Sequence, residues 1–113
     1  MYEVLNDLNK TTGITGSMVV GRDGIVIAAD LEEGSESDAV GALAASITTN
    51  IQKSLDRLES KPLSQVTIEA ENSKLFFSDA GVGILVVTTQ KDVNIGLIRL
   101  EIKNAIGKIS LAG

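Results

Sequence analysis

The sequence contains neither cysteine nor histidine, and these two absences exclude several kinds of catalysis and metal binding. Without cysteine, the protein can form no disulfide and use no thiolate nucleophile. Without histidine, Ser–His–Asp and Cys–His mechanisms are impossible, and so is a typical zinc site. We therefore expect no catalytic residue, no metal ligand and no bound cofactor, and we expect that the protein is not an enzyme.

Aromatic residues and positive charge are both scarce. Only 3% of the residues are aromatic, whereas proteins that bind single-stranded nucleic acid usually stack bases on aromatic side chains. The 10 basic residues are outnumbered by 15 acidic ones, the net charge is −5, and no basic run stands out. Nucleic acid and anionic membranes are both attracted by concentrated positive charge. We therefore expect protein partners rather than either of these.

Long hydrophobic runs are also absent. The longest apolar runs fall far short of the ~20 residues that span a bilayer. Met1 begins a polar amphipathic segment, without the basic and then apolar regions of a secretory leader. These features predict a cytoplasmic protein with no membrane span. At 113 residues and 43% hydrophobic content, we expect one domain over residues 1–113 with an aliphatic core.

The stretch from Asp38 to Glu59 is the longest periodic segment, and it predicts a long helix. Ser35 or Ser37 is expected to cap its first turn, and Pro62 prevents its continuation. Apolar side chains recur at spacings of three and four and predict one face packed on a sheet. They are Val40, Ala44, Ile47, Ile51, Leu55 and Leu58.

The opposite face of this helix carries small, uncharged residues where a solvated helix usually carries charges. They are Ala42, Ala45, Ser46 and Thr49. Small side chains allow a second backbone to approach, which favours a face that contacts a partner. Alanine also has high helix propensity, so a plain surface helix without a partner explains the same residues. This face alone does not separate the two interpretations.

The remaining periodic segments predict two further helices and five strands. The helices are Met1–Lys10 and Val93–Ile109, and the strands are Ile14–Val20, Ile25–Ala29, Leu63–Ala70, Lys74–Asp79 and Val82–Val87. Short links between successive strands imply antiparallel pairing. The strand Val82–Val87 is apolar without alternation, which is typical of a strand buried on both faces.

These elements predict an α+β fold built on a central antiparallel five-stranded sheet. Its order is helix-strand-strand-helix-strand-strand-strand-helix, with the first and last helices on one face and the long helix on the other. On the last helix, Val93, Leu97 and Leu100 form a second apolar stripe that we expect to receive the N-terminal helix.

If the strand Leu63–Ala70 lies at the sheet edge, it exposes unpaired backbone groups. A second copy of the chain would cover this edge by pairing with it while the small-residue faces of the two long helices meet. We therefore expect a homodimer. The candidate interface residues are Ala42, Ala45, Ser46, Thr49, Lys53, Val66 and Ile68.

Two segments resemble the Roadblock/dynein light chain domain family, over essentially the whole chain. They are residues 12–24, TGITGSMVVGRDG, and residues 92–103, DVNIGLIRLEIK. Both motifs have structural roles: Gly13 is placed for a left-handed conformation after the first helix, and Gly24 serves a hairpin. Asn94 is expected to cap the last helix, and Gly96 to allow close approach in its first turn. The resemblance implies a Roadblock-like, profilin-like sandwich.

The resemblance also implies a function. It suggests a homodimer that regulates or anchors a small Ras-like GTPase, and the prokaryotic relatives look like a gliding-motility protein that activates such a GTPase. Those activators carry chain beyond the domain, whereas this sequence stops at Gly113, which favours docking or scaffolding over activation. The GTPase-facing candidates carried over are Glu36, Ala42, Ala45, Ser46, Thr49 and Lys53.

Arg57 is the arginine best placed to reach a GTPase as a catalytic finger, although a solvated helix charge explains it better. Other functions remain open. The chain fits a structural adaptor for a motor or signalling complex without GTPase contact, and it fits a heterodimer with a paralogue. A small-molecule sensor is a further alternative, with Gly16, Gly81 and Gly83 leaving room for a ligand.

Overall fold

The computed structural model describes residues 1–59 and 62–112, and its elements follow the predicted order. The helices are α1 (Tyr2–Asn9), α2 (Ser37–Arg57) and α3 (Ile95–Ala112). The strands are β1 (Ile14–Val20), β2 (Val26–Asp30), β3 (Gln65–Glu69), β4 (Ser73–Asp79) and β5 (Ile84–Gln90). In the described part of the chain, no helix is long and apolar enough to cross a membrane.

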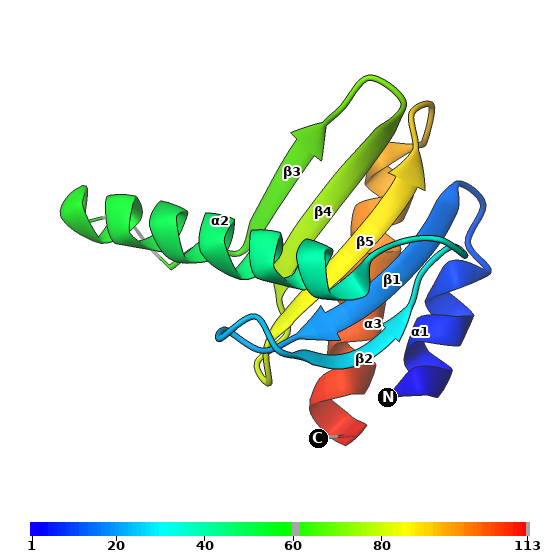
Figure 1. The fold of residues 1–113 in the computed structure, drawn as a ribbon, viewed down its shortest axis with the longest axis horizontal. Coiled ribbons are helices and arrows are strands. Elements are labelled where there is room, and N and C mark those ends of the chain that lie inside the picture. Colours follow the sequence, from blue (N-terminus) through cyan, green and yellow to red (C-terminus); the bar gives the residue numbers. More distant parts are fainter. Residues whose placement is uncertain (60–61, 113) are drawn as a thin grey trace.

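The five strands form one antiparallel sheet in the order β2-β1-β5-β4-β3. The apolar strand β5 lies at its centre, and β3 lies at one edge, which is the condition on which the expected edge-to-edge pairing depends. In Figure 1, α1 and α3 cover one face of the sheet, and α2 crosses the other face and continues past β3. The predicted α+β class and layer arrangement are therefore confirmed.

The two edges of the sheet differ in regularity. The β3–β4 register is continuous from Gln65 to Glu69. In contrast, the β1–β2 register shifts after Val19 pairs with Ala28, because Val20 then pairs with Val26. Ile27 is the extra residue of this bulge, and its side chain is 47% exposed.

The sheet separates two cores. One lies under α1 and α3 and the other lies under α2. The adjacent residues Phe76 and Phe77 point to opposite faces of β4, so each core receives one buried ring. Buried side chains of the first core include Leu5, Leu85, Ile98, Ile102 and Ile109; those of the second include Met18, Val20, Ile84 and Val86.

The helix ends correct one prediction and confirm another. The N-cap residue of α2 is Glu36, and no side chain bonds to the cap, so the predicted capping by Ser35 or Ser37 is wrong. At α3, Asn94 Oδ1 accepts a hydrogen bond of 3.1 Å from the backbone N–H of Leu97, as predicted. A Cβ at Gly96 would meet only this Asn94 oxygen, at 3.3 Å. Gly96 thus leaves room for the cap, which is the one close contact at this position within the described residues.

The expected second stripe of α3 does not receive α1. Leu97 and Leu100 are 39% and 54% exposed. Instead, Leu8 of α1 packs in the same core as the buried residues of α3, which are Ile98, Ile102, Ala105 and Ile109. One face of α3 therefore serves both the sheet and α1.

Glycines occupy positions that a side chain would disturb. Gly24 has φ +86° in the β1–β2 turn, and Gly13 has φ +96° in the α1–β1 connection, where glycine is favoured. A Cβ at Gly16 would lie 2.9 Å from Leu31 Cα, and a Cβ at Gly83 would collide with the Val20 carbonyl oxygen. Neighbouring backbone therefore lies against Gly16 and Gly83, which leave no room for a ligand, whereas a Cβ at Gly81, the third glycine suggested, would meet nothing within 4 Å.

This packing predicts that Gly83→Ala destabilises the fold by about 1–3 kcal/mol, because the backbone of β1 must move. The matched control is Gly107→Ala in α3, where a Cβ meets nothing within 4 Å. Since alanine favours helix, the control should gain about 0.5–1 kcal/mol. Chemical denaturation followed by circular dichroism measures both changes. Equal stability of the two variants would contradict the close approach.

Candidate functional site

The first half of α2 packs closely on the sheet, and its smallest residues make the contact. Only Gly41, Ala44 and Ala45 of this helix are buried. A Cβ at Gly41 would lie 3.0 Å from Val20 Cγ2 and 3.3 Å from the Gly24 carbonyl oxygen. The small residues therefore bring this part of α2 close to β1 and to the β1–β2 turn.

The burial of Ala45 contradicts one prediction about the partner-facing side of α2. It is 7% exposed and belongs to the core under α2, so the prediction that it points outward to a second copy or a GTPase is wrong. The physical reason is that a small side chain fits a close helix–sheet contact as well as a helix–partner contact. The other predicted partner-facing positions of α2 are exposed: Glu36, Ala42, Ser46, Thr49, Lys53 and Arg57.

The second half of α2 and the neighbouring sheet edge leave apolar side chains partly uncovered. Leu58 is 72% exposed, whereas the others are half-buried. On β3 and β4, the half-buried apolar residues Val66, Ile68 and Leu75 pack against the core under α2. We call these residues the α2–β3 surface: Ile51, Leu55, Leu58, Val66, Ile68 and Leu75. It includes the predicted interface residues Val66 and Ile68, and it lies beside the edge of β3 that no strand of this sheet covers.

A cleft of about 220 Å³ lies between α2 and the ends of β4 and β5. We call it the α2 cleft. Its floor includes Phe77 and Ile84, which are 1% and 2% exposed. The complete lining is Arg22, Thr48, Thr49, Gln52, Lys53, Leu63, Ser64, Phe77, Asp79 and Ile84.

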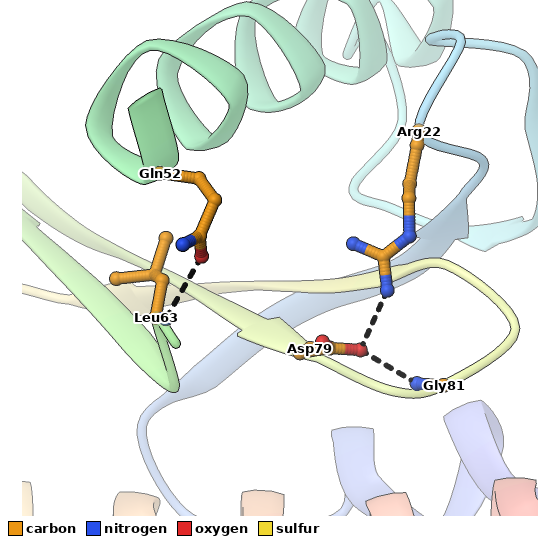
Figure 2. Close-up of polar contacts among 5 residues, drawn as sticks. All are labelled: Arg22, Gln52, Leu63, Asp79 and Gly81. Carbon is orange, nitrogen blue, oxygen red and sulfur yellow. Dashed lines mark hydrogen bonds and ion pairs between the residues drawn. The ribbon is translucent and has the colours of Figure 1, made fainter. Parts of the chain in front are cut away.

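Two polar contacts connect the walls of the α2 cleft (Figure 2). Gln52 Oε1 accepts a hydrogen bond of 2.9 Å from the Leu63 backbone N–H, which joins α2 to the segment before β3. Arg22 Nη2 donates to Asp79 Oδ1 at 3.0 Å, which joins the β1–β2 turn to the end of β4. The same carboxylate accepts a bond of 2.8 Å from the Gly81 backbone N–H.

These contacts lower the pKa of the Asp79 carboxyl below its ordinary value of 3.8. The largest cause is the backbone N–H of Gly81, and the hydrogen bond and charge of Arg22 add to it, while partial burial opposes them. The sequence analysis singled out Arg57 and did not identify Arg22, Asp79 or Gln52 as parts of a site. The spacing Asp79-Ala80-Gly81 was the available signal, because aspartate often bonds the backbone two residues on.

No metal-binding arrangement occurs among residues 1–59 and 62–112, where no group of three His, Cys, Asp or Glu side chains is suitably placed. The chemically distinctive features are the apolar α2–β3 surface and the α2 cleft. Both lie along α2.

The lowered pKa of Asp79 makes a testable contribution to stability. Because the folded state favours the carboxylate, this contribution is present above the unfolded pKa and is lost as the pH falls through the folded pKa. We expect Asp79→Asn to lower the melting temperature at neutral pH and to match the wild type once the pH has fallen below the lowered pKa of Asp79 in the folded state. Asp92→Asn, which neutralises an exposed carboxylate elsewhere, is the control. A pH-independent difference for Asp79→Asn would refute the electrostatic explanation.

Comparison with known proteins places this geometry in context. The model of the Roadblock/LC7 domain matches residues 1–89. Two uncharacterized proteins of Methanocaldococcus jannaschii, MJ0310 and MJ1340, are each 46% identical to this chain over 106 residues. Each alignment covers 94% of this chain and 93% of the relative.

Solved structures share the fold at lower identity. A Roadblock/LC7 domain from Streptomyces avermitilis superimposes with a TM-score of 0.92 at 19% identity, over 99% of this chain and 96% of that one. MglB of Myxococcus xanthus gives 0.91 at 19% identity, over 97% and 91%. An MglB with a tetrameric arrangement gives 0.84 at 22% identity, over 96% and 83%. At sequence identities of 19–22%, these superpositions establish the fold of the chain but not its function.

Proposed function

Because the chain belongs to the Roadblock/LC7 domain family, whose members are generally non-catalytic adaptor or regulatory modules, we propose that it is a dimeric regulatory or scaffold module for a small Ras-like GTPase. In this role it binds the GTPase and modulates its nucleotide cycle. The observation that carries the proposal is the α2–β3 surface, which combines uncovered apolar side chains with an uncovered strand edge.

A second copy of the chain suits this surface. Antiparallel pairing of the two β3 edges would satisfy their backbone groups, and it is an isologous contact that closes at two copies. In Figure 1, α2 continues past β3, so in such a dimer its outer half would lie over the sheet of the other copy. Leu55 and Leu58 would then be buried, at about 1.5–3 kcal/mol for each fully buried side chain. The tetrameric arrangement named for one MglB supports self-association in this fold.

The outer face of α2 suits a GTPase. From Ala39 to Gln52 the helix carries no charged residue, so a partner can pack on it without desolvating ions. Ala42, Ser46 and Thr49 are exposed there, and Lys53 lies at the end of this uncharged stretch. The choice of a GTPase as partner rests on the family resemblance and on the MglB proteins that share the fold.

The proposed dimer predicts a molar mass of twice 11.8 kDa in solution. Leu55→Glu on α2 and Ile68→Glu on β3 should each shift light scattering toward the monomer, because a charge would be buried at the interface. Leu100→Glu is the matched control, since it changes an exposed leucine of α3 on the other face of the sheet. Circular dichroism verifies that each variant is folded. A wild type that stays monomeric on concentration would contradict the dimer.

Partner binding is tested by capture of a Ras-like GTPase from the same organism, loaded with GDP or with a non-hydrolysable GTP analogue. We expect the immobilised chain to retain one nucleotide state several-fold better than the other. Ser46→Arg should reduce this capture, because a long charged side chain would obstruct the outer face of α2. Equal capture in both states would favour the adaptor function, and no capture would contradict GTPase binding.

The role of Arg57 is tested separately by measuring GTP hydrolysis. The side chain is exposed in the last turn of α2, where a cation interacts favourably with the helix dipole. We therefore expect Arg57→Ala to leave any stimulation of hydrolysis unchanged, whereas removal of a catalytic arginine costs roughly 10³-fold or more. A large loss of hydrolysis with unchanged binding would identify Arg57 as a finger.

A further inference from the structure

We propose that the α2 cleft binds a small organic monoanion, namely a carboxylate with a short apolar body. This inference concerns a ligand rather than a protein partner and rests on the cleft, although Thr49 and Lys53 of the cleft also belong to the α2 face proposed for the GTPase. The site does not use Gly16 or Gly83, which neighbouring backbone approaches closely, but it lies next to Gly81, whose N–H bonds Asp79 of the lining.

The size and floor of the cleft favour a small ligand with an apolar part. The cavity of about 220 Å³ is smaller than the ~300–1,000 Å³ of pockets for drug-sized molecules. Phe77 and Ile84 form an apolar floor, and Leu63 contributes a half-buried apolar wall. A chain of several methylene groups would displace water from this floor and gain the usual hydrophobic free energy.

The charges of the lining favour a single negative charge on the ligand. Arg22 and Lys53 contribute two cations and Asp79 one anion, so the lining is net positive in a chain whose net charge is −5. Asp79 already accepts hydrogen bonds from Arg22 and Gly81. Lys53 forms no ion pair within the described residues. One positive charge therefore remains for a ligand, which suits a carboxylate better than a doubly charged phosphate.

The donors available for this anion are already positioned. Arg22 uses one terminal nitrogen for Asp79, and Figure 2 shows the other pointing toward the side on which Gln52 lies. The Gln52–Leu63 hydrogen bond fixes the opposite wall. The exposed residues Thr49 and Ser64 supply hydroxyl groups to the lining. The cleft is therefore a preformed arrangement of donors around an apolar floor, as small-ligand sites commonly are.

Ligand binding at this position is compatible with the proposed dimer. The cleft reaches Asp79 at one end of β4, whereas Leu75 of the α2–β3 surface lies four residues earlier, roughly 13 Å along the strand. In Figure 1, α2 crosses the strands between the β3–β4 hairpin end and the β4–β5 turn. The cleft and the most apolar part of the dimer surface therefore lie on opposite sides of α2.

The test is a titration of the full chain with hexanoate, followed by amide shifts in NMR spectra. We expect saturable shifts in the millimolar range, as suits so small a ligand, centred on Thr49, Lys53 and Ser64. Lys53→Gln should weaken binding about two- to fivefold, the worth of one exposed ion pair. Lys103→Gln on α3 is the matched control and should leave binding unchanged, since this exposed lysine lies on the other face.

A series of ligands separates the apolar and charged contributions. From butyrate to hexanoate, affinity should rise up to roughly fourfold per methylene until the floor is covered. The neutral 1-hexanol should bind more weakly than hexanoate, and equally well to wild type and Lys53→Gln. The proposal is overturned by an absence of saturable shifts in the cleft, by shifts centred on α1 and α3, or by binding that Lys53→Gln does not weaken. Shifts in the cleft that occur only with a GTPase would assign it to the protein partner instead.

Discussion

The close contact between the first half of α2 and strand β1 determines the arrangement of everything on that face of the sheet. Gly41 lies against Val20, the Gly24 carbonyl oxygen and Met18, and a Cβ there would be 3.0–3.4 Å from each of them. Ala44 and Ala45 continue the contact as buried side chains. Because the helix is rigid and is held at this end, its second half must leave the sheet beyond β3 (Figure 1). The α2–β3 surface and the α2 cleft both result from this geometry.

The outer half of α2 leaves apolar side chains partly uncovered and is joined by a hydrogen bond to the segment before β3. Gln52 bonds the backbone of Leu63, and the Arg22–Asp79 pair joins two turns that flank the same cleft. Contacts of this kind are individually weak when exposed. They nevertheless leave the apolar residues Leu55 and Leu58 available to another molecule, which a fully packed helix would not. The proposed dimer and the proposed ligand site thus use different sides of one incompletely buried helix.

The sequence predicted well whatever depends on local pattern. The unbroken apolar run of β5 identified the central strand, the position of β3 after the long helix suggested the edge, and Asn94 was recognised as a cap. The two Roadblock-like segments led to the family that the comparisons support.

The errors concern choices that only tertiary structure decides. Periodicity defines the faces of α2 but not which face meets the sheet, so Ala45 was placed outward although it is buried. Leu97 and Leu100 form a regular stripe that no element of the described structure covers. The Arg22–Asp79 pair joins residues 57 positions apart in the sequence, and no local sequence pattern predicts a contact across such a separation.

The bulge in β2 has a consequence for how copies of the chain can assemble. A regular strand such as β3 presents evenly spaced backbone groups, whereas a bulged strand presents a twisted and interrupted edge that resists pairing. Pairing with another copy would therefore be favoured at β3 and disfavoured at β2. In the proposed dimer, both outer ends of the joined sheet would be β2 strands, so the sheet would not grow further. The irregularity at Ile27 would then favour a finite particle over an open-ended fibre.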